Sequence, residues 1–150
     1  MSIAERAVEP EVAEAWIRDA LRIDPQGVCL TVSGTCMEPS LPERSKVTLL
    51  PPPAAVRVGD VVLLRTVASL RLHRVLVSGR TGIRTKGDRG MYLDPGAPPS
   101  AVIGVCETNE SRLALRVRAV LSLARLLARP MAAPFTAGRG GDTPHARLLA

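Results

Sequence analysis

The alternation of hydrophobic and polar residues divides the chain into a helix, a series of short strands and a second helix. Pro10 opens a helical segment over 10–22, whose apolar residues recur every three or four positions on one face: Val12, Ala13, Trp16, Ile17, Ala20 and Leu21. Charged residues take the other face, with Glu14 and Arg18 at a favourable i,i+4 spacing. The pattern predicts a helix packed on the domain, with docking to a partner as the alternative.

From residue 28 onwards the period becomes strand-like. Short runs rich in valine, leucine and isoleucine, separated by glycine and proline turns, predict strands over 28–32, 46–50, 61–65, 70–77, 83–86 and 101–106. Residues 112–118 alternate leucine or valine with arginine, which predicts a further strand with one solvent-facing side. A leucine-rich helix is expected over 120–129, ended by Pro130.

These elements predict one mainly β domain of short, mostly antiparallel strands with a helix at each end. A chain of 150 residues is long enough for a single hydrophobic core. The expected organisation is a helical segment over 1–26, a β domain over 27–118, a short helix over 119–130 and a disordered tail over 131–150, where glycine, proline and alanine dominate.

Composition and charge narrow the range of partners. The formal net charge is +6, and nearly all of the basic residues are arginines. Such a balance suits nucleic acid, anionic membranes or acidic substrates, although an arginine-biased solvated surface explains it equally well. The chain has one tryptophan, one tyrosine and one phenylalanine, too few for a base-stacking platform, so no nucleic-acid partner is expected.

The cysteine count and the N-terminal residues predict a cytoplasmic protein. Three cysteines are an odd number, which favours a reducing compartment over a disulfide framework. The first 22 residues are too charged for the apolar region of a signal peptide, and no stretch has the roughly 18 apolar residues of a membrane span. Cys29 and Cys106 lie in apolar strands and are expected to be small buried hydrophobes.

Cys36 differs from these two, because it follows a strand and precedes a proline-rich turn. A thiol attacks as the thiolate and needs a neighbouring base. His145 lies in the expected tail, whereas His73 lies within a strand, where it is either that base or a structural histidine bonded to a backbone carbonyl. Zinc binding by Cys36, His73 and Cys106 lacks the usual ligand spacing, so no metal or cofactor is expected.

Five short motifs occur in a fixed order over residues 28–106. Gly34 to Pro39 reads G-x-C-M-x-P and resembles the nucleophile motif G-x-S-M-x-P of the type I signal peptidase and LexA-like superfamily, with cysteine in place of serine. The later motifs of that superfamily are similar to four more segments of this chain: Gly59-Asp60-Val61-Val62, His73-Arg74-Val75, Thr85-Lys86-Gly87-Asp88 with the acidic Asp94 after it, and Ile103-Gly104-Val105. The histidine motif is similar to the eukaryotic and archaeal type, which has histidine where the bacterial type has lysine.

The resemblance implies roles for individual residues. It makes Cys36 the nucleophile, His73 the general base and Asp94 the acid that orients the histidine. Asp88 is then a structural aspartate or the alternative third member. The resemblance also implies an oxyanion hole at the Cys36 N–H, aided by the hydroxyl of Thr35 or Ser33, and a cleft lined by Met37.

The resemblance therefore implies a signal-peptidase/LexA-like fold and a soluble peptidase that cleaves a peptide or protein substrate, in maturation or leader removal. Two alternatives are a LexA-like self-cleaving regulator and a non-catalytic peptide-binding module. The first is disfavoured because 22 residues are short for a DNA-binding domain. Arg118, Arg125 and Arg129 on the C-terminal helix also make a peripheral contact with an anionic membrane an alternative to simple docking of that helix.

Overall fold

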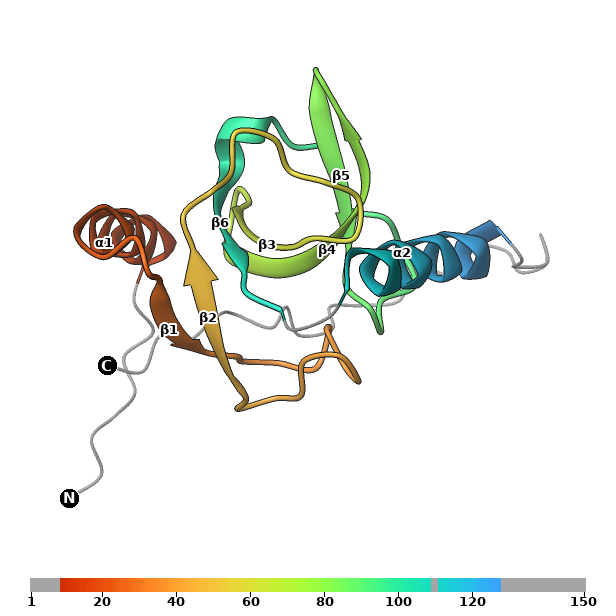
Figure 1. The fold of residues 1–150 in the computed structure, drawn as a ribbon, viewed down its shortest axis with the longest axis horizontal. Helices are drawn as coiled ribbons and strands as arrows, with labels where there is room; N and C mark the ends of the chain where they lie inside the picture. Colours follow the sequence, from red (N-terminus) through yellow and green to blue (C-terminus); the bar gives the residue numbers. More distant parts are fainter. Residues whose placement is uncertain (1–8, 109–110, 128–150) are drawn as a thin grey trace.

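In the computed structural model, which describes residues 9–108 and 111–127, six strands form one antiparallel sheet between two helices (Figure 1). In chain order the elements are α1 (Pro10–Ile23), β1 (Val28–Thr31), β2 (Lys46–Leu50), β3 (Val61–Arg65), β4 (Leu70–Gly79), β5 (Gly82–Lys86), a 3₁₀ turn (Pro99–Ala101), β6 (Val102–Cys106) and α2 (Arg112–Leu127). The strand order is β1-β2-β6-β3-β4-β5. The prediction of a mainly β domain with a helix at each end is confirmed.

The sheet curls, so that its two faces bury separate clusters of apolar side chains (Figure 1). Val61 and Leu63 of β3 join the larger cluster with the inner face of α1, whereas Val62 and Leu64 join the smaller one with Val75 and Ile83. Successive residues of a strand point to opposite faces, which explains why β3 is apolar throughout rather than alternating. β6 and β3 are the two central strands of the sheet, and β4, which carries His73, pairs with β3.

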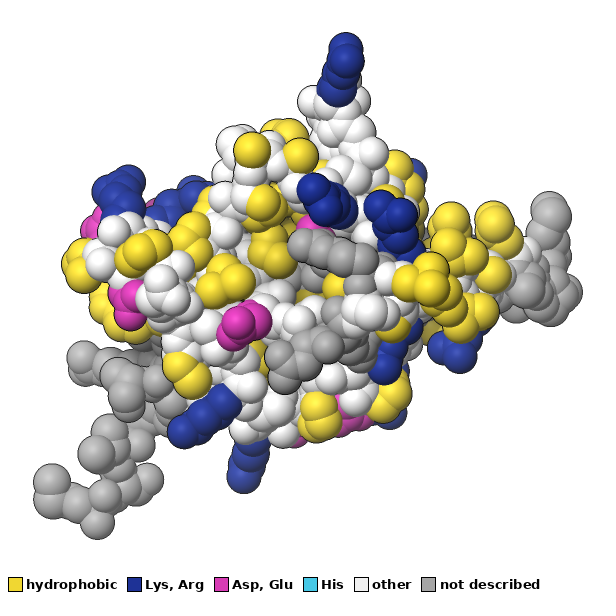
Figure 2. Space-filling view, in the orientation of Figure 1, with side chains coloured by type: hydrophobic (Ala, Val, Ile, Leu, Met, Phe, Trp, Pro, Cys, Tyr) yellow, Lys and Arg dark blue, Asp and Glu magenta, His cyan; other side chains and the backbone are white. Residues whose placement is uncertain are grey.

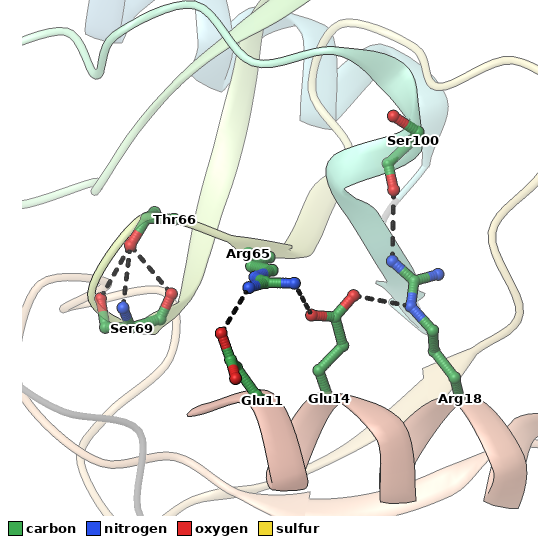
Figure 3. Close-up of polar contacts among 7 residues, drawn as sticks. All are labelled: Glu11, Glu14, Arg18, Arg65, Thr66, Ser69 and Ser100. Carbon is green, nitrogen blue, oxygen red and sulfur yellow. Dashed lines mark hydrogen bonds and ion pairs between the residues drawn. The ribbon is translucent and has the colours of Figure 1, made fainter. Parts of the chain in front are cut away.

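Ion pairs hold α1 against the sheet. Arg65, at the end of β3, reaches Glu11 at 3.0 Å and Glu14 at 3.2 Å, and Glu14 also accepts a hydrogen bond from Arg18 at 2.8 Å. Arg18 in turn reaches the carbonyl of Ser100 before β6, at 3.2 Å (Figure 3). Figure 3 also shows the Thr66–Ser69 turn that leads into β4.

The predicted amphipathic helix is confirmed, but its apolar face is only half covered. The buried residues are Ala13, Ile17 and Leu21. Val12 and Trp16 remain 59% and 52% exposed. α1 therefore packs on the sheet along a narrower stripe than its sequence suggests.

The predicted strand over 112–118 is wrong, because these residues form the first half of α2. Seven residues that alternate leucine or valine with arginine fit a strand, but leucine, alanine and arginine are strong helix formers. Burial decides the matter, since Leu115, Ala119 and Ser122 are buried at helical spacing while Leu113 and Val117 are exposed. The domain boundary expected between residues 118 and 119 consequently falls inside α2.

Some expectations concern residues that the structure does not describe. The tail over 131–150, His145 and the last three residues of the helical segment 119–130, Arg129 included, lie outside the described residues. Within the described ranges, neither helix has the length and hydropathy needed to cross a bilayer.

The cysteines differ from their prediction at one position. Cys106 is buried, as expected, and its burial raises the pKa of its thiol to about 12. Cys29 is exposed, because its side of β1 faces solvent rather than the core, so its prediction as a buried hydrophobe is wrong. Cys36 is half-buried at the edge of the larger core cluster.

Candidate active site

The loop between β1 and β2 holds Cys36 in a fixed position. Two backbone hydrogen bonds close its base, from Val32 N to Ser45 O at 2.9 Å and from Arg44 N to Val32 O at 2.8 Å. The side chain of Met37 is fully buried in the larger core cluster. It anchors the loop from below, so the expectation that Met37 lines an open cleft is wrong, while the neighbouring Cys36 stays only half-buried.

His73 and Asp94 form the polar centre of the site. The Nδ1 atom of His73 lies 2.5 Å from Oδ2 of Asp94, which also accepts a hydrogen bond from the Thr85 hydroxyl at 2.6 Å. The backbone N–H of Asp94 donates to the carbonyl of Thr85 at 2.8 Å, and the Arg71 guanidinium lies 3.7 Å from Oδ1. Asp94 is therefore fixed at both oxygens and at its backbone, and it orients the imidazole ring.

Gly87 shows that Cys36 and His73 face each other. A Cβ atom built on Gly87 would lie 3.2 Å from Nε2 of His73, 3.2 Å from Cβ of Cys36 and 2.7 Å from the carbonyl oxygen of Cys36. Nδ1 of the same ring is taken by Asp94, so Nε2 is the nitrogen turned toward the cysteine. The residues predicted as nucleophile, base and orienting acid are thus brought together, from three distant segments of the chain.

The electrostatics of the site favour a protonated imidazole. Burial lowers the pKa of His73, but hydrogen bonds to Asp94 and Cys36, together with their negative charges, outweigh burial and raise the pKa to about 9. Burial acts in the opposite sense on Asp94, and the hydrogen bonds from His73 and Thr85 hold the pKa of this carboxyl below its usual value. At neutral pH the pair is therefore an imidazolium and a carboxylate, next to the side chain of Cys36.

Asp88, the alternative third member, pairs with another residue. Arg74 donates two hydrogen bonds to its carboxylate, from Nε at 2.8 Å and from Nη2 at 2.7 Å, and a third from Nη1 to the carbonyl of Gly59 at 2.9 Å. Arg74 is 2% exposed. Burial raises the pKa of Asp88, but the hydrogen bonds from Arg74 and Ser40 lower it by more. The net effect is a pKa below the usual value, so the carboxyl stays ionised. The structure places Asp88 in a buried ion pair and leaves Asp94 as the partner of His73.

The predicted oxyanion residues lie beside the cysteine. Thr35 is exposed and Ser33 is half-buried. Among the described residues, no acceptor occupies the backbone N–H of Cys36. An N–H group with this freedom next to the sulfur suits a developing oxyanion, the role predicted for it.

Arg89 ties the Cys36 loop to the loop that follows β5. Its backbone N–H donates to the carbonyl of Cys36 at 2.9 Å, and its guanidinium pairs with Glu38 at 2.8 Å. The second loop, residues 87–94, thus contacts the Cys36 loop through Arg89, His73 through Asp94 and Arg74 through Asp88. One short segment therefore contacts both the Cys36 loop and His73.

A buried lysine joins this segment to α2. Nζ of Lys86 donates to the carbonyl of Gly87 at 3.0 Å and to the hydroxyl of Ser122 at 2.8 Å. Lys86 is 3% exposed, and burial lowers the pKa of its ammonium group. Its contacts make it a structural link between the helix and the site.

Thr85 and Gly87 stand in a motif recognised in the sequence, but sequence reasoning gave neither residue a role of its own. Only the pairing of β4 with β5 places the Thr85 hydroxyl at Asp94. For Gly87 the sequence shows a glycine before an aspartate at the end of β5. That Cys36 and His73 approach this glycine too closely for a side chain appears only in the packing. No group of three or more His, Cys, Asp and Glu side chains within residues 9–108 and 111–127 is arranged to hold a metal ion.

The raised pKa of His73 predicts a loss of stability at mildly alkaline pH. A group with a folded-state pKa of about 9 and an unfolded value of 6.5 stabilises the fold fully below pH 6.5, and this contribution is lost as the pH rises through about 9. The difference corresponds to on the order of 3 kcal/mol in the free energy of unfolding. Urea titrations of wild type and His73→Gln at intervals from pH 6 to pH 9 will measure it.

Subtracting the two titrations removes the ionisation of other groups, Cys106 included. The free energy of unfolding of the wild type should approach that of the variant as the pH rises. Parallel curves over this range would contradict the proposed ion pair.

Comparison with models of known protein families, with curated proteins and with solved structures gave no match to this chain. The assignment of the candidate site therefore rests on its geometry and on the motifs of the sequence.

Proposed function

We propose that this chain is a peptidase that cleaves a peptide or protein substrate through Cys36, His73 and Asp94. One observation carries the proposal: Nε2 of His73 and Cβ of Cys36 lie next to Gly87, each 3.2 Å from the point where a Cβ on that glycine would be, while Asp94 holds Nδ1 at 2.5 Å. A thiol, an imidazole and a carboxylate in this order form the nucleophile, base and orienting group of a cysteine hydrolase.

We further propose the signal-peptidase/LexA-like fold for the β domain. The order of the five motifs along the chain supports it, as does their position in the structure. The nucleophile motif lies in the loop after β1, and the other four lie on β3, β4, β5 and β6 or at their ends, all in one sheet. Substitution of cysteine for serine suits the histidine motif, because an imidazole is an established partner of a cysteine nucleophile.

Acylation begins with attack by the Cys36 sulfur on the scissile carbonyl carbon. The carbonyl π electrons move to oxygen, and the backbone N–H of Cys36 donates to the resulting oxyanion. His73 then transfers its Nε2 proton to the leaving nitrogen as the C–N bond breaks, so the new amine departs neutral and the acyl group remains on sulfur as a thioester.

Deacylation reverses these roles with water. Neutral His73 accepts a proton from a water molecule, whose oxygen attacks the thioester carbon. The C–S bond breaks, the carboxylic acid leaves, and sulfur returns to the thiolate beside the imidazolium. Asp94, held by Thr85, keeps Nδ1 protonated through both steps, and Nε2 is consequently the nitrogen that exchanges protons.

Thiol reactivity tests the proposal without knowledge of the substrate. At pH 6 unpaired thiols are largely protonated, so we expect iodoacetamide to alkylate Cys36 well before Cys29, although Cys29 is the exposed cysteine. Mass spectrometry of digested protein will locate the label. A short peptide carrying a thiol-directed reactive group should then modify Cys36 in the Cys29→Ser variant and nothing in Cys36→Ala. Faster labelling of Cys29 would remove the basis of the mechanism.

Two glycine variants provide a matched control for the geometry. Gly87→Ala places a methyl group against both Cys36 and His73, 3.2 Å from Cβ of the first and from Nε2 of the second, and only 2.7 Å from the Cys36 carbonyl oxygen. Gly96, like Gly87, follows β5 in the chain, and Gly96→Ala places the same group in open space. The first variant should lose preferential alkylation of Cys36 at pH 6, and the second should retain it.

The rival functions differ in what happens to a peptide that the protein binds. A peptide-binding module would bind extended peptides, at the edge of β1 or β5 for example, and release them unchanged. A self-cleaving regulator would cut its own chain. Incubation of wild type with a mixed peptide library, followed by mass spectrometry of peptides and protein, distinguishes these results.

A further inference from the structure

The outward face of α2 is apolar over its whole length. Five side chains at helical spacing lie on it, and they are 72%, 48%, 62%, 54% and 79% exposed in order along the chain: Leu113, Val117, Val120, Leu121 and Leu127. We call them the α2 stripe. Figure 2 shows hydrophobic side chains gathered over this helix. Single exposed hydrophobes are ordinary, but a continuous row along one helix requires an explanation.

The opposite face of α2 is fixed to the domain, so the helix cannot rotate to bury the stripe. Leu115, Ala119 and Ser122 are buried against the sheet. Ser122 is hydrogen-bonded to Lys86 at 2.8 Å. A Cβ on Gly59 would lie 2.7 Å from the backbone of Leu115, which shows that the helix backbone touches the turn before β3.

The charges on α2 select the partner. From Arg112 to Leu127 the helix has four arginines and no acidic residue. At 100° per residue, Arg116 lies beside one edge of the α2 stripe, and Arg118 and Arg125 lie beside the other. Arg116 and Arg125 are exposed, whereas Arg118 reaches the Ser40 hydroxyl at 2.8 Å. An apolar stripe between rows of arginine matches the layered chemistry of an anionic bilayer surface, apolar below and negative above.

We infer that the outward face of α2 binds the surface of an anionic membrane, with the α2 stripe inserted at the level of the lipid headgroups and the arginines at the phosphates. The helix lies parallel to the surface and does not cross it. This inference uses no residue of the catalytic site and is independent of the proposed peptidase activity.

Sedimentation with vesicles tests the inference on the full chain. We expect binding to vesicles of 70% phosphatidylcholine and 30% phosphatidylglycerol, and little binding to phosphatidylcholine alone. Val120→Gln combined with Leu121→Gln should reduce binding to the background level. Arg116→Gln combined with Arg125→Gln should weaken it roughly 25-fold, since each cation near an anionic surface contributes about fivefold.

Matched controls change the same chemistry elsewhere on the surface. Ile23→Gln with Val67→Gln removes two side chains that are 84% and 106% exposed, and Arg80→Gln with Arg84→Gln removes two exposed charges from the β4–β5 hairpin. Both control variants should bind like wild type. Circular dichroism and the alkylation rate of Cys36 will show that every variant is folded.

Three results would overturn the inference. Binding that persists in Val120→Gln/Leu121→Gln would place the contact outside the α2 stripe. Failure of the wild type to bind anionic vesicles would exclude the membrane as its partner. A dimer detected by light scattering and abolished by the same double substitution would assign the stripe to a second copy of the chain.

Discussion

Replacing His73 by alanine should lower the turnover of any peptide that this protein cleaves by about 10²–10⁴-fold, the usual contribution of a positioned general base. The substitution removes the cation beside Cys36 as well as the proton donor to the leaving nitrogen. It should leave peptide affinity nearly unchanged, because in the proposed mechanism the imidazole acts on the sulfur and the scissile bond rather than on distant parts of the substrate.

Affinity and turnover are separated by using two backgrounds. Turnover is measured for His73→Ala against wild type, and affinity for Cys36→Ala against Cys36→Ala/His73→Ala, neither of which can cleave. Asp94→Asn offers a graded comparison, because it retains the shape of the side chain but weakens its hold on Nδ1. Cleavage that continues undiminished in Cys36→Ala would show that another residue is the nucleophile.

Replacing Arg74 by methionine should destabilise the fold by about 3–5 kcal/mol, the usual effect of removing one partner from a buried ion pair. Arg74 is 2% exposed and makes three hydrogen bonds, two of them to Asp88. Methionine fills much of the same space but leaves the carboxylate without its charged partner. Urea denaturation at pH 7 measures the loss.

A double-mutant cycle with Asp88→Leu assigns this loss to the unpaired charge. The variant Arg74→Met/Asp88→Leu should regain much of the lost stability, because an apolar pair no longer leaves a charge buried. Arg22→Met serves as the surface control. Its pair with Asp19 is 79% and 66% exposed and should contribute less than about 1 kcal/mol. A double variant as unstable as Arg74→Met alone would show that packing, not charge, explains the effect.

The sequence predicts most strands of this protein because the composition of each run and the turns on either side of it indicate the same element. Runs such as Val61-Val62-Leu63-Leu64 are apolar, β-branched or leucine-rich and bounded by turns, and β3 forms where expected with one ladder on either side. Residues 112–118 mislead for the opposite reason. Their two-residue alternation fits a strand, and only the burial of Leu115 with Ala119 and Ser122 reveals a helix with an exposed apolar face.

The candidate site shows a similar division. Cys36 and His73 carry chemistry and stand in recognisable motifs, so the sequence alone is enough to propose them, with Asp94 or Asp88 as the third member. The choice between Asp88 and Asp94 needs the fold. His73 and Arg74 point to opposite sides of β4, and only the structure shows that Asp94 pairs with the first and Asp88 with the second. Thr85 and Gly87 act through position alone, and position depends on the pairing of β4 with β5.

The exposed side of Cys29 marks another limit of sequence reasoning. Its neighbours are apolar, yet β1 is an edge strand with only β2 beside it, and its cysteine side is left to solvent. A short apolar run does not say whether one or both of its faces will be covered.

Segment 87–94 is fastened to consecutive residues of β4 that point to opposite faces, His73 through Asp94 and Arg74 through Asp88. A local opening of this segment would have to break a buried ion pair and the site together. The backbone amides of Arg89 and Asp94, bonded to Cys36 and Thr85, should therefore exchange with deuterium about as slowly as amides in the centre of the sheet, although they belong to a surface loop. On warming, the preferential alkylation of Cys36 over Cys29 and the overall fold should be lost in a single transition.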